Sequence, residues 1–210
     1  KFSGSSSILT TSMKSVGEAM AIGRSFEESF QKAIRSLEIG LSGWGSNPNL
    51  LDVNICDLDR KLRTPSPERI FYIWIAMNHG RSDQNLHETT NIDKWFIYKL
   101  RNIFDSYYLY LHNKSLDDLN SDVLFKLKQL GFSDKQIATA TNTYELQVRS
   151  RRLKLNILPV YKTVDTCAAE FVSSTPYLYS TYERPIKILN SNGKLLDEHL
   201  INESEISDSP

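Results

Sequence analysis

The sequence predicts a mainly α-helical fold, in which a helical domain of two small layers follows one strand and helix of an α/β unit and precedes an extended connector. Two observations predict the helical domain. Apolar residues recur at helical spacing, between capping residues, from Pro67 to Leu155, and no strand-like alternation interrupts this stretch. A third observation, the tyrosine-rich and β-branched composition that begins after Pro159, predicts the connector.

The α/β unit would occupy residues 1–40. Apolar residues between flexible glycines predict a short buried strand within Met13–Arg24. Ser25 can cap a helix over Phe26–Glu38, with Glu28 three residues later in capping-box position. One stripe of this helix is apolar: Phe26, Phe30, Ala33, Ile34 and Leu37. Because such a stripe needs a sheet to cover, we expect the strand and helix to be the end of a larger unit.

A loop composition in Gly40–Asn49 marks the predicted domain boundary, and residues 41–66 are predicted to be a linker. The helical domain would then span residues 67–158. Its first helix has Ser66 as a cap and Gly80 just past its end. Since this helix is apolar on nearly every side, we expect neighbouring elements to bury it.

Five further helices are predicted. Ser82 caps a short one, and a long helix follows over about Ile92–His112. The last three are short: one stops at Gly131, the next has a Ser133–Gln136 capping box, and the third opens at Thr143. The side chains of the long helix that should face inward are Ile92, Trp95, Phe96, Leu100, Ile103, Tyr107 and Leu111. We expect the two layers to share this long helix.

Residues 159–183 form the predicted connector, and residues 184–210 form a predicted insertion. Asn192 and Gly193, between apolar flanks, could make the turn of a hairpin. Acidic residues from Asp197 onward have little apolar surface to bury, so we expect the insertion to be partly disordered.

Charge and cysteine content argue against several classes of protein. The chain has 210 residues, with 25 basic and 25 acidic side chains and no net charge, which disfavours a binder of nucleic acid or of anionic membranes. Its two cysteines, Cys56 and Cys167, lie in no zinc-binding or redox spacing. No stretch resembles a signal sequence or is long enough to cross a bilayer. We therefore expect a cytoplasmic protein with free thiols.

A catalytic centre is not expected within these residues. Nucleotide-dependent catalysis would need a Gly-rich phosphate loop, a cluster of cations and two or three carboxylates for magnesium. These are not present as a set, and the four histidines are scattered. We therefore predict no catalytic residue, no metal site and no bound cofactor in this chain, which should be inactive by itself.

Five stretches, in order along the chain, match motifs of a known family. They are Met13–Arg24, Asp93–Phe96, Gly131–Asp134, Tyr161–Phe171 and Tyr177–Glu183. The first is nearly identical to a run that closes the first synthetase half of that family, and the last two match its link to the second half almost without gaps. Together these stretches resemble the large chain of carbamoyl phosphate synthetase.

The resemblance implies that residues 1–40 end the first ATP-grasp unit and that residues 67–158 are the oligomerisation domain between the two synthetase halves. It implies a parent ligase that uses ATP, with Mg²⁺ or Mn²⁺, to make carbamoyl phosphate from bicarbonate and glutamine-derived ammonia, for pyrimidine or arginine biosynthesis. The implied partners are further copies of the chain, the two synthetase halves and a glutaminase subunit or domain.

Glu18 is the first candidate site residue. A carboxylate inside an apolar strand is costly to bury unless it has a partner or lines a wet passage. The resemblance assigns Glu18 to the passage that carries carbamate from the first synthetase site to the second. A structural ion pair of Glu18 with Lys14 or Arg24 is the alternative, and both could hold.

Two further features of the helical domain are candidate binding surfaces. Tyr98, Tyr108 and Tyr110 fall off the predicted buried stripe of the long helix, which suits a protein interface. The basic run Arg149–Lys154 follows a helix, a turn and a second helix. This leaves an alternative function open, a helical adaptor whose helix-turn-helix-like basic helix binds a protein or nucleic acid. Nearby acidic residues favour a solvated face or salt bridges to a neighbouring domain over DNA binding.

Overall fold

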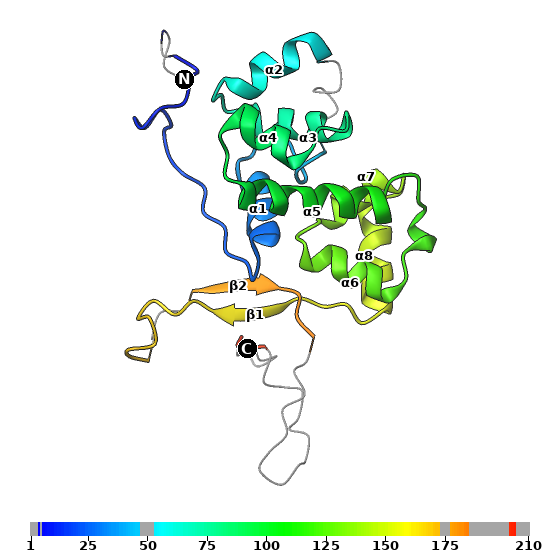
Figure 1. The fold of residues 1–210 in the computed structure, drawn as a ribbon. Helices are drawn as coiled ribbons and strands as arrows, with labels where there is room; N and C mark the ends of the chain where they lie inside the picture. The colour runs from blue at the N-terminus through cyan, green and yellow to red at the C-terminus, as the bar shows by residue number, and fades with distance from the viewer. Residues whose placement is uncertain (1–3, 5, 47–52, 173–176, 185–201, 205–210) are drawn as a thin grey trace.

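A computed structural model describes residues 4, 6–46, 53–172, 177–184 and 202–204 of the chain. Within these residues the fold is mainly α-helical, as predicted, with one small sheet (Figure 1). The elements in chain order are α1 (Phe26–Ser36), α2 (Ile55–Arg63), α3 (Arg69–Asn78), α4 (Asp83–Thr90), α5 (Lys94–Tyr110), the 3₁₀ turn η2 (Leu116–Asp118), α6 (Ser121–Gln129), α7 (Asp134–Ala140), α8 (Glu145–Lys154), β1 (Val160–Thr163) and β2 (Leu178–Thr181).

The long helix α5 joins two groups of helices (Figure 1). It packs on α1, α3 and α4, while α2 packs on α3 and α4. Helices α7 and α8 pack on each other, and Figure 1 shows them beside α6 near the C-terminal end of α5. No strand lies between Pro67 and Leu155, all of which the structure describes. The predicted helical domain, with its long helix shared between two small layers, is therefore confirmed.

Serine caps begin three helices as predicted. Ser25, Ser82 and Ser133 each accept a hydrogen bond from the backbone N–H three residues further on. The start of α3 differs from the prediction, because Glu68 rather than Ser66 occupies the N-cap position.

Helix α3 lies in the centre of the core, where the side chains of Ile73–Met77 are all buried. The buried stripe of α5 is shifted from the predicted one. Trp95 and Phe96 are 51% and 45% exposed, whereas Ile97 is fully buried. The reason is that Trp95 and Phe96 rest edge-on against Phe26 of α1, with ring centroids 5.4 and 5.6 Å away, and α1 leaves their outer faces open.

The strand predicted within Met13–Arg24 is wrong for this structure. These residues belong to no sheet, and Val16 and Met20 are 68% and 83% exposed. A strand exists only through hydrogen bonds to a neighbouring strand. In the described part of the chain, no strand pairs with this segment in a sheet.

Helix α2 lies within residues 41–66, for which the sequence predicted only a linker. Asn54 caps it by accepting a hydrogen bond from the Cys56 N–H, and its buried side chains are Leu58 and Leu62. The i,i+4 spacing of these leucines after a capping residue is the signal that could have revealed this helix. The division of the chain into domains at residues 40 and 66 stays a prediction.

The extended connector contains the two strands of the sheet. β1 and β2 pair antiparallel, with Val160 opposite Thr181 and Thr163 opposite Leu178. The hairpin predicted at Asn192 and Gly193 lies outside the described residues, as does most of the predicted acidic insertion.

Candidate coupling site around helix α1

Glu28, in the first turn of α1, is a buried carboxylate with three bonding partners. It is 2% exposed and forms an ion pair of 2.8 Å with Lys32 Nζ. It also accepts hydrogen bonds from the Arg24 N–H at 2.8 Å and from the Thr181 hydroxyl at 3.0 Å. Because a buried carboxylate is stable only when such partners satisfy it, Glu28 holds the chain before α1 and the end of β2 against the same helix turn.

Lys32, one turn further along α1, reinforces this junction. Its ammonium donates hydrogen bonds to the carbonyl oxygens of Ile22, at 2.9 Å, and of Ser180. Glu183, just after β2, extends this network by forming ion pairs with both Arg24 and Lys162. The junction therefore joins residues 22–25, α1 and the small sheet.

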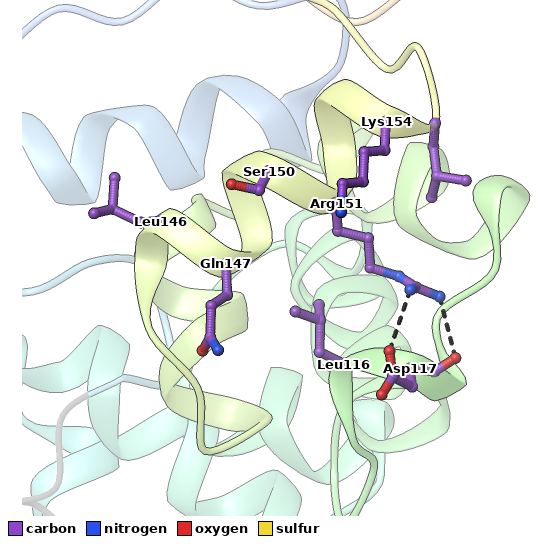
Figure 2. Close-up of a pocket in the computed structure, with 8 residues that line it drawn as sticks. Leu116, Asp117, Leu146, Gln147, Ser150, Arg151 and Lys154 are labelled. Atoms are coloured by element: carbon purple, nitrogen blue, oxygen red, sulfur yellow. Dashed lines mark hydrogen bonds and ion pairs between the residues drawn. The ribbon is translucent and has the colours of Figure 1, made fainter.

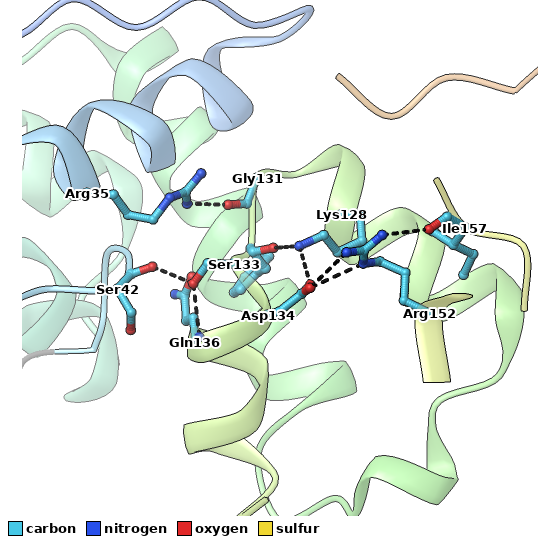
Figure 3. Close-up of polar contacts among 10 residues, drawn as sticks. Arg35, Ser42, Lys128, Gly131, Ser133, Asp134, Gln136, Arg152 and Ile157 are labelled. Carbon is cyan, nitrogen blue, oxygen red and sulfur yellow. Dashed lines mark hydrogen bonds and ion pairs between the residues drawn. The ribbon is translucent and has the colours of Figure 1, made fainter. Parts of the chain in front are cut away.

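A second buried ion cluster connects α6, α7 and α8 (Figure 3). The carboxylate of Asp134 lies 2.7 Å from Lys128 Nζ and 3.1 Å from Arg152 Nη2. Lys128 also donates to the Phe132 carbonyl oxygen, and Arg152 to that of Ile157. Each cation thus has a carboxylate and a backbone acceptor, which compensates for its burial.

Burial shapes the pKa values in this cluster. It lowers the pKa of Lys128 to about 8, against the opposing effect of Asp134. Burial also acts to raise the pKa of Asp134, but the Lys128 and Arg152 cations outweigh it and hold that pKa below its ordinary value.

Tyr182 brings the end of the sheet to this cluster. The Lys128 ammonium and the Arg152 guanidinium lie 5.3 and 5.9 Å from the centre of its ring, at cation–π distance. Burial raises the pKa of Tyr182 to about 12. The end of the sheet therefore contacts α1 through Thr181 and contacts α6 and α8 through Tyr182.

Trp44, in the loop after α1, is held by two glutamines from different helices. The backbone N–H of Trp44 donates to Gln31 Oε1 at 2.7 Å, and its backbone carbonyl oxygen accepts from Gln136 Nε2 at 2.9 Å. The fully buried indole donates to the Ile70 carbonyl oxygen and packs edge-on against Trp74. Since Gln136 is turned toward Trp44, the capping box predicted at residues 133–136 is only half formed.

Two further hydrogen bonds cross from the α1 region to the start of α7 (Figure 3). Arg35 Nη1 donates to the Gly131 carbonyl oxygen, and the Ser133 hydroxyl donates to the Ser42 carbonyl oxygen, both at 2.7 Å. A cavity of about 220 Å³ lies at this crossing, and Glu28, Lys32, Arg35, Lys128, Asp134 and Tyr182 are among the residues that line it. Desolvation at this place lowers the pKa of Arg35.

The contacts around Glu28 and Asp134 can hold neighbouring segments in position. In residues 4, 6–46, 53–172, 177–184 and 202–204, no group of three or more His, Cys, Asp or Glu side chains could hold a metal ion. Over the same residues, no helix is long and apolar enough to span a membrane.

The structure does not bring the predicted site residues together. Glu18 is exposed, and neither predicted ion pair forms, because Lys14 donates to backbone carbonyls and Arg24 pairs with Glu183. In the described part of the chain, no ion pair involves Glu18.

The three candidate tyrosines of α5 differ in their surroundings. Tyr98 is 62% exposed. Tyr108 and Tyr110 are half-buried against the core, where Tyr108 donates a hydrogen bond to Asn78 and Tyr110 accepts one from Lys126.

Two of the four cations in the basic run on α8 form ion pairs within the domain. Arg152 is buried on Asp134, as described above, and Arg151 pairs with Asp117 at 3.2 Å beside a cavity of about 400 Å³ (Figure 2). Arg151 also donates to the Leu119 carbonyl oxygen. These ion pairs lie inside the helical domain, and they leave Arg149 and Lys154 as the exposed cations of the run.

The sequence identifies Glu28 only as part of a capping box and Arg152 only as a member of a basic run. Asp134 and Thr181 stand only within stretches that match family motifs. Glu28 and Thr181 are 153 positions apart, and no spacing rule connects such residues. The one local signal is the i,i+4 spacing of Glu28 and Lys32, which favours an ion pair on one face of α1.

Comparison with known proteins identifies the family. The family model described as carbamoyl-phosphate synthetase large chain, oligomerisation domain, matches residues 18–156. The arginine-specific, chloroplastic carbamoyl phosphate synthase large chain of Oryza sativa subsp. japonica is 50% identical over 195 residues, which are 92% of this chain and 17% of that protein. The large chain of Synechocystis sp. is 52% identical over 183 residues, or 87% and 17%.

A third relative, the arginine-specific, chloroplastic large chain of Arabidopsis thaliana, is 48% identical over 92% of this chain. The chain spans only 16–17% of the length of these three relatives. The match of the family model over most of the helical fold, together with these identities, means that the chain belongs to the oligomerisation-domain family of carbamoyl-phosphate synthetase large chains.

Proposed function

We propose that this chain is the oligomerisation and coupling region of a carbamoyl phosphate synthetase, and that it is not catalytic by itself. The observation that carries the coupling role is the pair of buried ion clusters around Glu28 and Asp134. These clusters hold the segment before α1 and the sheet after α8 against helices α1, α6, α7 and α8. A displacement of either segment would therefore be resisted by buried charges, as a mechanical link between two flanking units requires.

The parent enzyme would be an ATP-dependent ligase that makes carbamoyl phosphate from bicarbonate and glutamine-derived ammonia. ATP, with Mg²⁺ or Mn²⁺, would bind in the synthetase halves, and a glutaminase subunit or domain would supply ammonia. Two relatives are named arginine-specific, which supports the arginine pathway alongside the pyrimidine pathway. We place the enzyme in the cytoplasm, although the names of these two relatives also carry the word chloroplastic.

The surface at the start of α5 is our candidate for self-association. Trp95 and Tyr98, three residues apart on the helix, are 51% and 62% exposed, and Phe96 beside them is 45% exposed. Exposed aromatic side chains are enriched at protein interfaces. Tyr108 and Tyr110, the other two candidate tyrosines, lie at the far end of α5, where they already bond within the domain.

Sedimentation velocity over a wide concentration range tests this surface. The unmodified chain should associate as concentration rises, and the double variant Trp95→Ser/Tyr98→Ser should remain monomeric. The matched control is Tyr144→Ser/Leu146→Ser at the start of α8, which removes two side chains that are 79% and 75% exposed. If the unmodified chain stays a monomer throughout, the self-association role is wrong. If the α8 variant is the one that dissociates, the interface lies on α8 instead.

For Glu18 we propose a place in the carbamate passage. Its exposure and its lack of an ion pair within the described residues leave the carboxylate free to line a passage built with other parts of the enzyme. In the intact enzyme, Glu18→Ala should reduce carbamoyl phosphate synthesis more than bicarbonate-dependent ATP hydrolysis. Equal loss of both activities would contradict this role. The control is Lys14→Ala, which changes a nearby residue of the same segment.

A further inference from the structure

The outer edge of β1 is occupied by a segment from near the end of the chain. Val164, just after β1, donates its N–H toward the β2 side, to the Tyr177 carbonyl oxygen. Tyr161 and Thr163 instead direct their backbone groups to Asn202 and Glu203. This alternation is the one expected of a strand that is paired on both sides.

The contacts imitate a third strand. The Glu203 N–H donates to the Tyr161 carbonyl oxygen at 2.8 Å, as in a strand ladder. On either side of this bond a side-chain oxygen replaces a carbonyl. Asn202 Oδ1 accepts from the Tyr161 N–H at 3.0 Å, and Glu203 Oε2 accepts from the Thr163 N–H at 2.7 Å. Three main-chain groups of the β1 edge are satisfied in this way.

The positive charge of Lys162 makes this edge selective for a segment that carries a carboxylate. The second carboxylate oxygen of Glu203 lies 3.2 Å from Lys162 Nζ, whose side chain is only 15% exposed. Lys162 also faces Glu183 at 3.8 Å. An extended segment that places one carboxylate between Lys162 and the Thr163 N–H therefore gains both a ladder and a charge-assisted bond.

The chain is also held where it leaves β2. Arg184 forms an ion pair with Asp122 of α6, and its guanidinium lies 4.8 Å from the centre of the Phe125 ring. Two points far apart along the C-terminal part of the chain are thus anchored, Arg184 on α6 and Glu203 on β1.

We propose that the outer edge of β1 is a docking site for an extended acidic segment, and that Asn202–Ser204 is the occupant supplied by this chain. The docked segment closes the sheet edge, which would otherwise offer unpaired backbone groups to another strand. It also brings residues from near the end of the chain back to the connector. This assignment does not depend on the proposed function of the parent enzyme.

Hydrogen exchange followed by NMR on the full chain tests the docking. Glu203→Ala should speed exchange of the Tyr161 and Thr163 amides by about tenfold or more, because a charge-assisted bond and its ladder neighbour are lost. The amides of β2 should stay protected, which reports that the sheet remains folded. The control is Glu170→Ala, which removes one exposed carboxylate from the same connector. Unchanged exchange at Tyr161 and Thr163 in Glu203→Ala would overturn the proposal.

A peptide with the sequence of residues 200–206 provides a second test. Added to the ¹⁵N-labelled Glu203→Ala chain, it should shift the Tyr161 and Thr163 amide signals, and it should shift them far less in the unmodified chain, whose edge is occupied. A peptide carrying alanine at the position of Glu203 should have a weaker effect. Absence of any shift in the variant, or equal shifts in both chains, would contradict a docking site at this edge.

Discussion

Gly131, two residues past the end of α6, lies directly against α1. Its φ is +85°, and a Cβ atom there would lie 2.8 Å from Gln31 Cβ and 2.9 Å from Glu28 Cα. The left-handed backbone and the close approach both require glycine. The Gly131 carbonyl oxygen also accepts the hydrogen bond from Arg35, so this glycine is part of the coupling site.

Gly131→Ala should therefore destabilise the chain more than Gly80→Ala. Gly80 has a similar φ of +77°, but a Cβ atom at that position would meet nothing within 4 Å. We expect a loss of about 1–2 kcal/mol for Gly80→Ala from backbone strain alone, and about 1–3 kcal/mol more for Gly131→Ala from the steric contact. Urea unfolding of both variants measures the difference. Equal losses would mean that α1 moves aside freely.

Asp134 should give the chain part of its acid sensitivity. Its folded pKa lies below the ordinary 3.8, so its contribution to stability is complete above that value and is lost as pH falls through the folded pKa. In Asp134→Asn this part of the pH dependence should disappear. The variant should also lose about 3 kcal/mol or more at pH 7, because Lys128 and Arg152 are left without their carboxylate.

Urea unfolding between pH 2 and 7 checks the Asp134 prediction. Asp117→Asn is the control, since Asp117 pairs with Arg151 but its side chain is 94% exposed, and its loss should cost no more than about 0.5 kcal/mol. A pH profile of Asp134→Asn that parallels that of the unmodified chain would contradict the assignment.

At the scale of elements, a buried hydrogen bond between Thr181 and Glu28 links β2 to α1, beside the bond from Lys32 to the Ser180 carbonyl oxygen. The Thr181 hydroxyl, on a residue 2% exposed, donates to the Glu28 carboxylate, which also holds Lys32. Since the two elements are remote in sequence, this bond can form only when the sheet has packed against α1.

A double-mutant cycle with Glu28→Gln and Thr181→Val should therefore give a coupling energy of about 1–2 kcal/mol. The matched cycle pairs Glu28→Gln with Thr163→Val on the neighbouring strand, and its two effects should be additive. Urea unfolding of the single and double variants gives both values. Additive effects in the Thr181 cycle would mean that the bond contributes nothing to docking.

At the scale of the whole molecule, the three tryptophans report on different surfaces. Trp44 and Trp74 are 0% and 7% exposed, whereas Trp95 is 51% exposed. Acrylamide, a water-borne quencher, should therefore reach mainly Trp95 in the monomer. A surface used for self-association should lose this accessibility as copies assemble.

Acrylamide quenching should thus be strong at low protein concentration and should fall as concentration rises. Trp95→Phe should abolish most of the quenching at every concentration, which identifies the residue responsible. Quenching of Trp95 that stays constant while sedimentation reports assembly would place the interface away from the start of α5.

Local patterns predicted most of the helices correctly. The caps at Ser25, Ser82 and Ser133 bond within four residues, so their sequence signal survives in the fold. The strand within Met13–Arg24 failed because apolar pattern alone supplies no neighbouring strand. Helix α2 was missed because its stripe is only two leucines wide.

By itself the sequence determined the helical class, most helix limits and the family resemblance, because capping and periodicity act over a single turn and motifs are read along the chain. Only the tertiary structure decided that Glu28 meets Thr181, that Asp134 lies between Lys128 and Arg152, and that Glu203 closes the edge of β1. Burial and pairing of charges depend on how distant segments approach one another, and no spacing along the chain encodes that approach.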